Sequence, residues 1–286
     1  MDFTNANTFG QESLGYPSST ILTDRSNATL SLQTMRASPT RRYDSLKRLL
    51  DFSAAVALIV TLCPIMAVAW LLVRLTSSGP GIYTQTRVGL GGRHFRIYKL
   101  RSMTHNCEAT TGGAKWSKPG DSRVTPVGRI FRKLHIDELP QLFNVLSGDM
   151  SLIGPRPERP EFVKPLSVSV PEYKLRLAVR PGVTGLAQIQ LPPDTDLDSV
   201  RRKIVLDRAY IEGRGLWLDL RLLIGTGIYL VGFPYTSVRR VLSLPNPLMF
   251  GPQLLMIKNG SSTVPVDSAT ALDKMQFEFT TPTLNT

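Results

Sequence analysis

Two adjacent carboxylates, Asp137 and Glu138, stand in a stretch of the sequence that is otherwise basic and apolar. Pro140 favours the first turn of a helix, so the sequence predicts Asp137 at or near a helix N-cap. The partial positive charge of such a helix end keeps a carboxylate ionised and attracts a phosphate. An ionised aspartate is a workable nucleophile toward phosphorus, and the second carboxylate is suited to hold a magnesium ion that bridges diphosphate oxygens. The alternative is an ordinary capping pair with no chemical role.

Basic residues are concentrated around this pair of carboxylates. Between Arg87 and Lys133 the sequence has 11 Lys or Arg against two acidic residues, Glu108 and Asp121, which contributes +9 of the total net charge of +12. Such a patch attracts anionic lipid headgroups and anionic ligands alike, and arginine can bind a phosphate through two donors at once. The alternative is a solvated, lipid-facing surface with no catalytic role.

A rigid turn follows further along the chain, where Arg156 is flanked by Pro155 and Pro157. A guanidinium held stiffly between two prolines can bind a phosphate with little ordering cost. The alternative is a purely structural loop. The three histidines share no metal-ligand spacing, and the two cysteines, Cys63 and Cys107, fit neither a disulfide framework nor a zinc site.

The elements that must position these groups begin with an apolar segment. Residues 52–73 form a run of 22 residues without a charge, long enough to cross a hydrocarbon core of roughly 30 Å. Pro64 interrupts the run, and basic residues flank it on both sides, which draws both ends toward the same side of a membrane. On these residues alone three structures stay open: a re-entrant hairpin that breaks at Cys63 and Pro64, a kinked single span, and a buried core helix.

The composition divides the chain into four parts. Residues 1–40, rich in Ser, Thr and Asn, are expected to form a disordered leader, and residues 41–76 the membrane-embedded segment. Residues 77–234 are expected to form a cytosolic catalytic domain continuous with that segment, and residues 235–286 an irregular tail. The net charge and a pI near 10.0 imply an anionic partner, and 42% hydrophobic residues exclude a chain that is disordered throughout.

Within the catalytic domain the sequence predicts an α+β fold that is predominantly helical. Residues 82–86 and 95–100 read as strands joined by a glycine-rich turn, which indicates a small β-hairpin. Residues 216–231 have the pattern of an amphipathic helix at a membrane interface, although an ordinary core helix has the same pattern. Other helical patterns cover residues 128–134, 139–146, 171–177 and 199–211.

Four stretches, in this order and after an apolar helix broken by proline, carry a resemblance to a known family. They are residues 95–103 (FRIYKLRSM), 137–145 (DELPQLFNV), 148–157 (GDMSLIGPRP) and 180–188 (RPGVTGLAQ). From about Lys47 to Gly232 the chain resembles the bacterial sugar transferases, the monotopic phosphoglycosyl transferases that start polysaccharide and glycoconjugate assembly. The short form of the family is implied, without the multi-helix membrane domain that precedes this unit in longer relatives.

The resemblance implies an enzyme that moves a sugar 1-phosphate from a nucleoside diphosphate sugar, typically a UDP-sugar, to polyprenyl phosphate in two steps. It implies that Asp137 attacks the β-phosphate and carries the phosphosugar covalently, and that Glu138 holds Mg²⁺. Arg132 matches a basic residue that meets the lipid phosphate. The loop near the nucleotide is matched by Pro155, Arg156 and Pro157, and further positions of the active-site region by Lys99, Arg101, Asp121 and Arg123.

The resemblance also implies a place in the cell. The family's apolar segment is a re-entrant helix with both ends on the cytoplasmic side of the bacterial inner membrane. Membrane lipid is therefore an expected partner, an oligomer is compatible with this arrangement, and nucleic acid is not expected. Cys63 departs from the serine that often precedes the proline in relatives. Residues 191–198 are unusual, and residues 210–217 keep only the outline of the corresponding family segment, which puts the sugar preference in doubt.

Two other classes of function compete with an enzyme. A non-catalytic membrane-surface binding module would use the basic cluster only to hold lipid or a partner, and Asp137 would then be dispensable. A nucleic-acid binder is disfavoured, because the basic cluster carries no recognisable recognition module and follows an apolar anchor.

Overall fold

The computed structural model describes residues 41–110, 120–194, 196–233 and 235–245. In these ranges the chain is predominantly helical, with two small sheets of two strands each. This agrees with the predicted α+β class. The leader predicted at residues 1–40 and most of the predicted tail lie outside the described residues.

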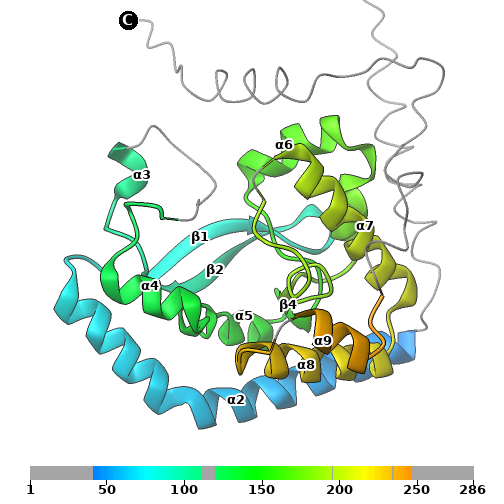
Figure 1. The fold of residues 1–286 in the computed structure, drawn as a ribbon, viewed down its shortest axis with the longest axis horizontal. Helices are drawn as coiled ribbons and strands as arrows, with labels where there is room; N and C mark the ends of the chain where they lie inside the picture. Colours follow the sequence, from blue (N-terminus) through cyan, green and yellow to red (C-terminus); the bar gives the residue numbers. More distant parts are fainter. Residues whose placement is uncertain (1–40, 111–119, 195, 234, 246–286) are drawn as a thin grey trace, which may run out of the picture. The chain divides into compact units, whose positions relative to one another are not determined.

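The apolar segment forms one long helix, α2 (Arg41–Thr76), which bends partway along its length (Figure 1). Pro64 lies inside the helix and has no N–H to donate to the preceding turn, which accounts for the bend. The helix is continuous through Cys63 and Pro64, where the sequence indicated a break. Its apolar side chains are largely exposed, and Val60 and Leu75 expose 70% and 74% of their surface. Within the described ranges α2 is the one helix long and apolar enough to cross a membrane.

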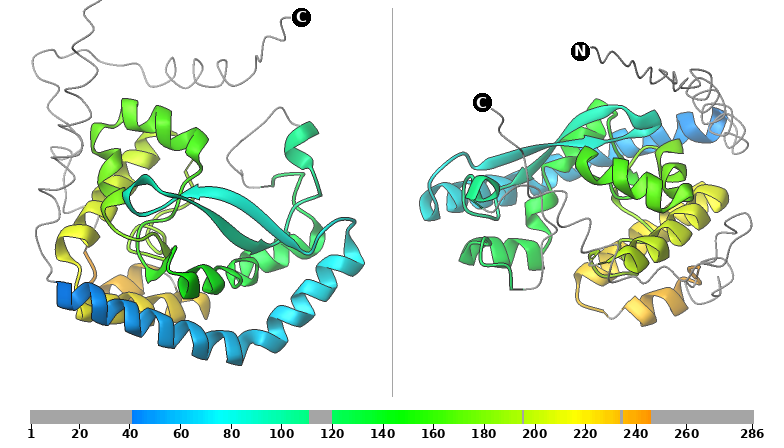
Figure 2. Two further views of the ribbon diagram at one scale, coloured as in Figure 1. Left: turned by 180° about the vertical axis from the view of Figure 1, so that it is seen from behind. Right: turned by 90° about the horizontal axis from the view of Figure 1, so that it is seen from above.

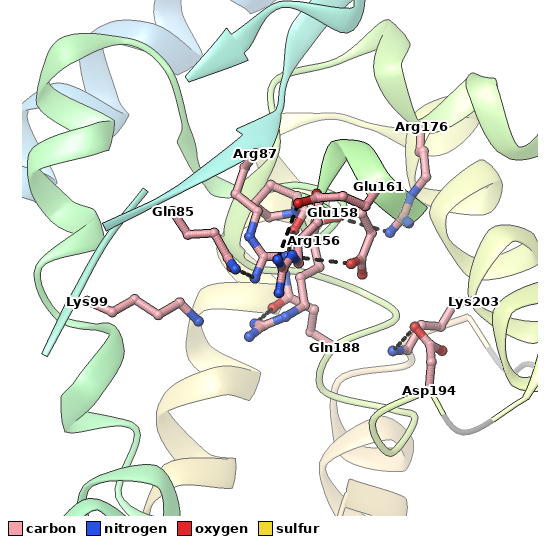
Figure 3. Close-up of polar contacts among 12 residues, drawn as sticks. Gln85, Arg87, Lys99, Arg156, Glu158, Glu161, Arg176, Gln188, Asp194 and Lys203 are labelled. Carbon is pink, nitrogen blue, oxygen red and sulfur yellow. Dashed lines mark hydrogen bonds and ion pairs between the residues drawn. The ribbon is translucent and has the colours of Figure 1, made fainter. Parts of the chain in front are cut away.

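The predicted hairpin is confirmed as an antiparallel pair of strands, β1 (Ile82–Val88) and β2 (His94–Leu100). Figure 2 shows this hairpin crossing the domain from the end of α2 toward α6. Residues paired across two strands share a face of the sheet. Lys99 on β2 therefore lies on the same face as Gln85 and Arg87 on β1, and this face is turned toward the interior of the domain (Figure 3).

Short helices and a second sheet make up the rest of the domain. β3 (Ser151–Ile153) and β4 (Gly182–Thr184) pair in parallel, an element that the sequence analysis did not predict. The remaining helical elements, in chain order, are η1 (Leu90–Gly92), α3 (Cys107–Thr110), α4 (Pro126–Lys133), η2 (Ile136–Glu138), α5 (Gln141–Ser147), α6 (Pro160–Ser169), η3 (Pro171–Ala178), α7 (Leu197–Gly213), α8 (Leu216–Leu230) and α9 (Tyr235–Val241).

The main hydrophobic core lies among α5, the β3–β4 sheet, α7 and α8, and it includes part of α2. Val145, Met150 and Leu206 expose none of their surface there. The buried carboxylate of Asp51, on α2, accepts a hydrogen bond of 2.7 Å from the Ser151 hydroxyl at the start of β3. The N-terminal half of α2 is thus packed onto the rest of the fold, and near its C-terminal end Ala69 and Val73 are buried against Leu100 and Phe131. Most of the other apolar side chains of α2 are exposed.

A helix occupies the start of the region predicted to be an irregular tail. α9 packs on α8, and Val238 and Leu244 are buried. The contact is close at Gly225 of α8, where a Cβ atom would lie 3.2 Å from the Val238 side chain. The Arg221 side chain of α8 donates to the carbonyl of Leu242, just after α9. These tertiary contacts stabilise a segment whose composition alone does not favour a helix, and the rest of the predicted tail lies outside the described residues.

Candidate active site

Asp137 lies in a short turn between two helices. After α4, His135 adopts the left-handed conformation with φ of 55°, and this starts the separate 3-10 turn η2, which contains Asp137 and Glu138. The N-cap of the following helix α5 is Pro140. Asp137 therefore does not occupy the predicted helix N-cap, because the left-handed His135 starts a separate turn at Ile136, and α5 begins only at Gln141. The aspartate exposes only 7% of its surface.

Glu138 is held between two cations that come from distant parts of the chain. Nζ of Lys99 lies 2.7 Å from Oε1 of Glu138. Arg156 donates to both carboxylate oxygens, at 2.6 Å to Oε1 and 3.3 Å to Oε2. Burial opposes ionisation, but the charges and hydrogen bonds of Arg156 and Lys99 outweigh it and hold the pKa of Glu138 well below its usual range. Glu138 is therefore an anion at neutral pH.

The neighbouring Asp137 has the opposite shift. Burial raises its pKa above the ordinary value for aspartate, and the charge of Glu138 raises it further. Lys99, Arg132 and Arg156 act in the other direction and favour the ionised form. Asp137 makes no ion pair within the described part of the chain, whereas Glu138 makes two. Within the described residues one carboxylate of the pair thus has two cationic partners, and the other forms no ion pair.

Arg156 is carried by the loop that follows β3. At the base of this loop the backbones at Gly154 and Gly182 cross so closely that a Cβ on Gly182 would lie 2.0 Å from the nitrogen of Gly154. The Arg156 side chain keeps 35% of its surface exposed and also donates to Oε1 of Gln188 at 3.1 Å. Figure 3 shows Lys99, Arg156 and Gln188 converging from three separate segments.

Buried Asn144 fixes the distance between the hairpin and the carboxylates. Its Nδ2 donates to the carbonyl of Arg96 at 2.7 Å, and its Oδ1 accepts from the backbone N–H of Tyr98 at 3.0 Å. These two bonds attach α5 to β2 one residue before Lys99. The contact between Lys99 and Glu138 therefore rests on a side chain that sequence reasoning did not single out, although Asn144 is part of the quoted DELPQLFNV stretch.

The other predicted site residues are distributed around this centre. Nε of Arg132 donates to the Ser102 hydroxyl at 2.9 Å, and the charge of Arg132 lowers the pKa of Asp137. Asp121 and Arg123 pair with each other, with Nη2 of the arginine 2.6 Å from Oδ2 of the aspartate. That pair lies in the turn before α4.

The Arg101 side chain is bonded to the end of α2 and not to the two carboxylates. Its Nη2 donates to both the carbonyl and the hydroxyl of Ser77 at 2.8 Å, just beyond the C-terminus of α2. The residue exposes 4% of its surface. A buried guanidinium at the carbonyl end of a helix satisfies acceptors that the helix itself leaves unpaired. The structure thus places Arg101 at the end of the apolar helix.

Sequence reasoning missed three further residues of the site. Gln188 contacts Arg156 directly, and its position at the end of the quoted RPGVTGLAQ stretch was the available signal. Gln85 and Arg87 lie on the inward face of β1 and are bonded to each other at 2.8 Å (Figure 3). The alternation of a strand shows that these two side chains share a face, but it does not show which face meets the site.

The donor set near Asp137 is compatible with magnesium. No group of three or more His, Cys, Asp or Glu side chains comes together in the described ranges. Mg²⁺ is commonly bound through one or two carboxylates and completes its shell with phosphate oxygens and water. Glu138 meets this requirement, because it is ionised and, among the residues that the structure describes, its Oε2 accepts a single bond, of 3.3 Å, from Arg156.

Comparison with known proteins finds the same family that the motifs indicate. Residues 42–232 match the family model for bacterial sugar transferases. A UDP-N-acetylgalactosamine-undecaprenyl-phosphate N-acetylgalactosaminephosphotransferase of Aeromonas hydrophila is 48% identical over 188 residues, which cover 66% of this chain and 44% of that relative. A UDP-glucose:undecaprenyl-phosphate glucose-1-phosphate transferase of Caulobacter vibrioides is 42% identical over 212 residues, covering 73% and 76% of the two chains.

A relative with the same name in Escherichia coli is 36% identical over 181 residues, which cover 62% of this chain and 38% of that protein. The chain therefore spans less than half the length of the Aeromonas and Escherichia relatives and about three quarters of the Caulobacter one. All three relatives are named as enzymes that transfer a sugar phosphate to undecaprenyl phosphate. The family match extends from the start of the apolar helix to the end of α8, and it shows that the chain belongs to the bacterial sugar transferase family.

Proposed function

We propose that the protein transfers a sugar 1-phosphate from a UDP-sugar to undecaprenyl phosphate through a covalent phosphosugar intermediate on Asp137. The observation that carries the proposal is the contrast between two adjacent carboxylates. Glu138 is neutralised by Lys99 and Arg156, while Asp137 is buried and forms no ion pair with any residue that the structure describes. The names of the relatives support the two substrates. The chemistry of the pair supports the covalent route.

In the first step a carboxylate oxygen of Asp137 attacks the β-phosphorus of the donor. A bond forms between that oxygen and phosphorus, and the bond from the β-phosphorus to the bridging oxygen breaks. Uridine monophosphate leaves with the bridging oxygen and its electron pair, and the sugar phosphate stays on the aspartate as an acyl phosphate. The donor brings negative charge to the reacting phosphorus, and we assign Arg156 and Lys99 to offset it.

In the second step a phosphate oxygen of the lipid acceptor attacks the same phosphorus. The bond between phosphorus and the aspartate oxygen breaks, which restores the Asp137 carboxylate and yields a polyprenyl diphosphate sugar. The charge of Arg132 lowers the pKa of Asp137, and Arg132 is the residue we assign to the acceptor phosphate. Mg²⁺, when held by Glu138 and the donor diphosphate, would neutralise charge on the phosphate oxygens.

The membrane assignment follows from α2. We infer that this helix enters the bilayer, bends at Pro64 and leaves on the side from which it came, with both ends and the catalytic domain on the cytoplasmic face of the bacterial inner membrane. Basic residues at both ends and the bend support this course. The exposed apolar face of α8, with Trp217 70% exposed and Ile224 46% exposed, is suited to lie in the same membrane surface.

The proposal is tested by transfer of radiolabel from a panel of UDP-sugars to undecaprenyl phosphate, with Mg²⁺ and purified protein. We expect label in the lipid phase from the wild type and at least about a thousandfold less from Asp137→Asn. Asp44→Asn, at an exposed aspartate in the first turn of α2, is the matched control and should keep wild-type activity. Transfer that survives in Asp137→Asn would contradict the mechanism, and no transfer with any donor would contradict the proposed reaction.

A further inference from the structure

The loop that carries Arg156 is fixed by donors from outside the loop. Its outer two carbonyls accept backbone hydrogen bonds, each of 2.9 Å: the Pro155 carbonyl from the N–H of Gly182, and the Glu158 carbonyl from the N–H of Val88. These bonds attach the loop to β4 on one side and to β1 on the other. They leave the two carbonyls between them, those of Arg156 and Pro157, to be satisfied in another way.

Two arginine side chains satisfy the middle carbonyls. Nη2 of Arg176, on η3, donates to the Arg156 carbonyl at 3.1 Å. Nη1 of Arg87, on β1, donates to the Pro157 carbonyl at 3.1 Å. Four consecutive carbonyls of the loop are therefore bonded to four different partners, and the middle two depend on guanidinium groups.

Each of these arginines is itself held in place. Arg176 exposes 5% of its side chain, lies 2.9 Å from a carboxylate oxygen of Asp207 on α7, and donates to the Tyr173 hydroxyl at 3.0 Å. Arg87 exposes 15% of its side chain and donates to Gln85 at 2.8 Å. Figure 3 shows both arginines beside the loop, reaching it from different segments. Neither arginine contacts Asp137 or Glu138.

The composition of the loop explains why outside donors are needed. Pro155 and Pro157 have no backbone N–H, so the loop has few donors of its own and cannot form a regular turn with them. A guanidinium offers several donors in one plane and can bind a carbonyl and a second acceptor together. A lysine ammonium at the same position keeps the charge but not this fixed geometry.

We propose that Arg87 and Arg176 are positioning residues, which act through the backbone of the loop to place the Arg156 guanidinium against the donor diphosphate. The inference rests on the proposed function, because it assigns to Arg156 a contact with the donor. A displacement of about 1 Å in a positioned group can cost about a hundredfold in rate. Loosening either middle carbonyl should thus reduce reaction with the donor, although neither arginine reaches the reacting atoms.

Kinetics of Arg87→Lys and Arg176→Lys test the inference. We expect each variant to lose about 10- to 100-fold in kcat/KM for the UDP-sugar. In an Arg156→Ala background the same substitutions should cost less than about threefold, because residues that act through one another are not additive. Arg180→Lys is the matched control, since Arg180 also donates to a loop carbonyl, that of Gly148, away from Asp137. Arg180→Lys should change kcat/KM by the same factor in the wild-type background and in the Arg156→Ala background. Full additivity of Arg87→Lys or Arg176→Lys with Arg156→Ala would overturn the proposal.

Hydrogen exchange supplies a readout that does not depend on activity. The N–H groups of Val88 and Gly182 donate to the loop, so their exchange reports how firmly it is held. We expect faster exchange at both in Arg87→Lys and Arg176→Lys, with the thermal midpoint of unfolding within a few degrees of wild type. Unchanged exchange would overturn the proposal. If the wild-type protein transferred no sugar phosphate, the proposed function would be contradicted. Hydrogen exchange would then still show whether Arg87 and Arg176 hold the loop.

Discussion

The Arg156 guanidinium binds the Glu138 carboxylate through both terminal nitrogens, although the two residues lie 18 positions apart and belong to different motifs. This pair, with Lys99, keeps Glu138 ionised in a buried place. Of the two adjacent acids, Asp137 is the one that forms no ion pair in the described part of the chain. The different environments of these two neighbouring acids thus come from tertiary contacts and not from their own residue types.

The rate of the first half-reaction should fall at low pH, and the pKa of Asp137 should determine where this acid limb of the pH profile lies. Burial raises the pKa of Asp137, and only the ionised form attacks phosphorus, so release of UMP without acceptor should fall as pH drops through that raised pKa. Arg132 lowers the pKa of Asp137, so Arg132→Gln should move the limb to higher pH by up to about one unit. Lys133→Gln, at the adjacent exposed cation, is the control. A limb that moves equally in both variants, or in neither, would disprove this assignment.

Glu138 should contribute to stability in a defined range of pH. Its pKa is depressed in the folded protein, so its contribution is complete above the ordinary glutamate value of about 4.3 and is lost as pH falls through the folded pKa. Glu138→Gln leaves Lys99 and Arg156 without their anion and should cost about 3 kcal/mol at pH 7. Thermal unfolding from pH 3 to pH 8 checks this. A difference between wild type and variant that persists undiminished at pH 3 would contradict it.

Arg101 should matter for folding more than for donor binding. Its guanidinium donates to Ser77 at the end of α2, and Arg101→Met leaves those acceptors without this partner. We expect a loss of about 2 kcal/mol in the free energy of unfolding, with the KM for the UDP-sugar unchanged. Arg101→Lys should recover part of the stability. A raised KM at unchanged stability would instead support the substrate-binding role that the family resemblance implies.

The course of α2 through the membrane can be read from two engineered cysteines. In a Cys63→Ser, Cys107→Ser background, Ser45→Cys and Ser78→Cys place a thiol at either end of the apolar run. On intact spheroplasts we expect a membrane-impermeant maleimide to label neither, and to label both after permeabilisation. Adding Pro64→Leu should straighten the helix and favour a full span, which would expose one end. External labelling of either end without Pro64→Leu would contradict the re-entrant course.

The residues of the site could be predicted from motifs, but their contacts could not. Asp137, Glu138 and Arg156 stand out by type and neighbours, whereas the approach of Lys99 depends on Asn144, which joins α5 to β2. Arg101 shows the limit of strand alternation. Arg101 lies two positions after Lys99, so in a continuing strand the two side chains would share a face. However, β2 ends at Leu100, and the Arg101 side chain donates to Ser77 instead.

Local backbone changes account for the other differences. Pro140 predicted a helix N-cap at Asp137, but the left-handed conformation of His135 inserts a separate turn, and few sequence signals mark such a residue when it is not glycine. The hairpin followed directly from its alternating pattern and glycines. The three-residue strands β3 and β4 did not, because such short strands are defined by their pairing and not by a pattern of their own.

The central claim is that Asp137 carries the phosphosugar. Its most direct test is to incubate purified protein with Mg²⁺ and the accepted UDP-sugar without polyprenyl phosphate, stop the reaction under denaturing conditions, and map the protein by mass spectrometry. The account predicts one hexose phosphate, or its N-acetylated counterpart, on the peptide that contains Asp137. This adduct should disappear when acceptor is added and should be absent from Asp137→Asn. Rapid transfer with no trapped adduct, or an adduct on another residue, would contradict the account.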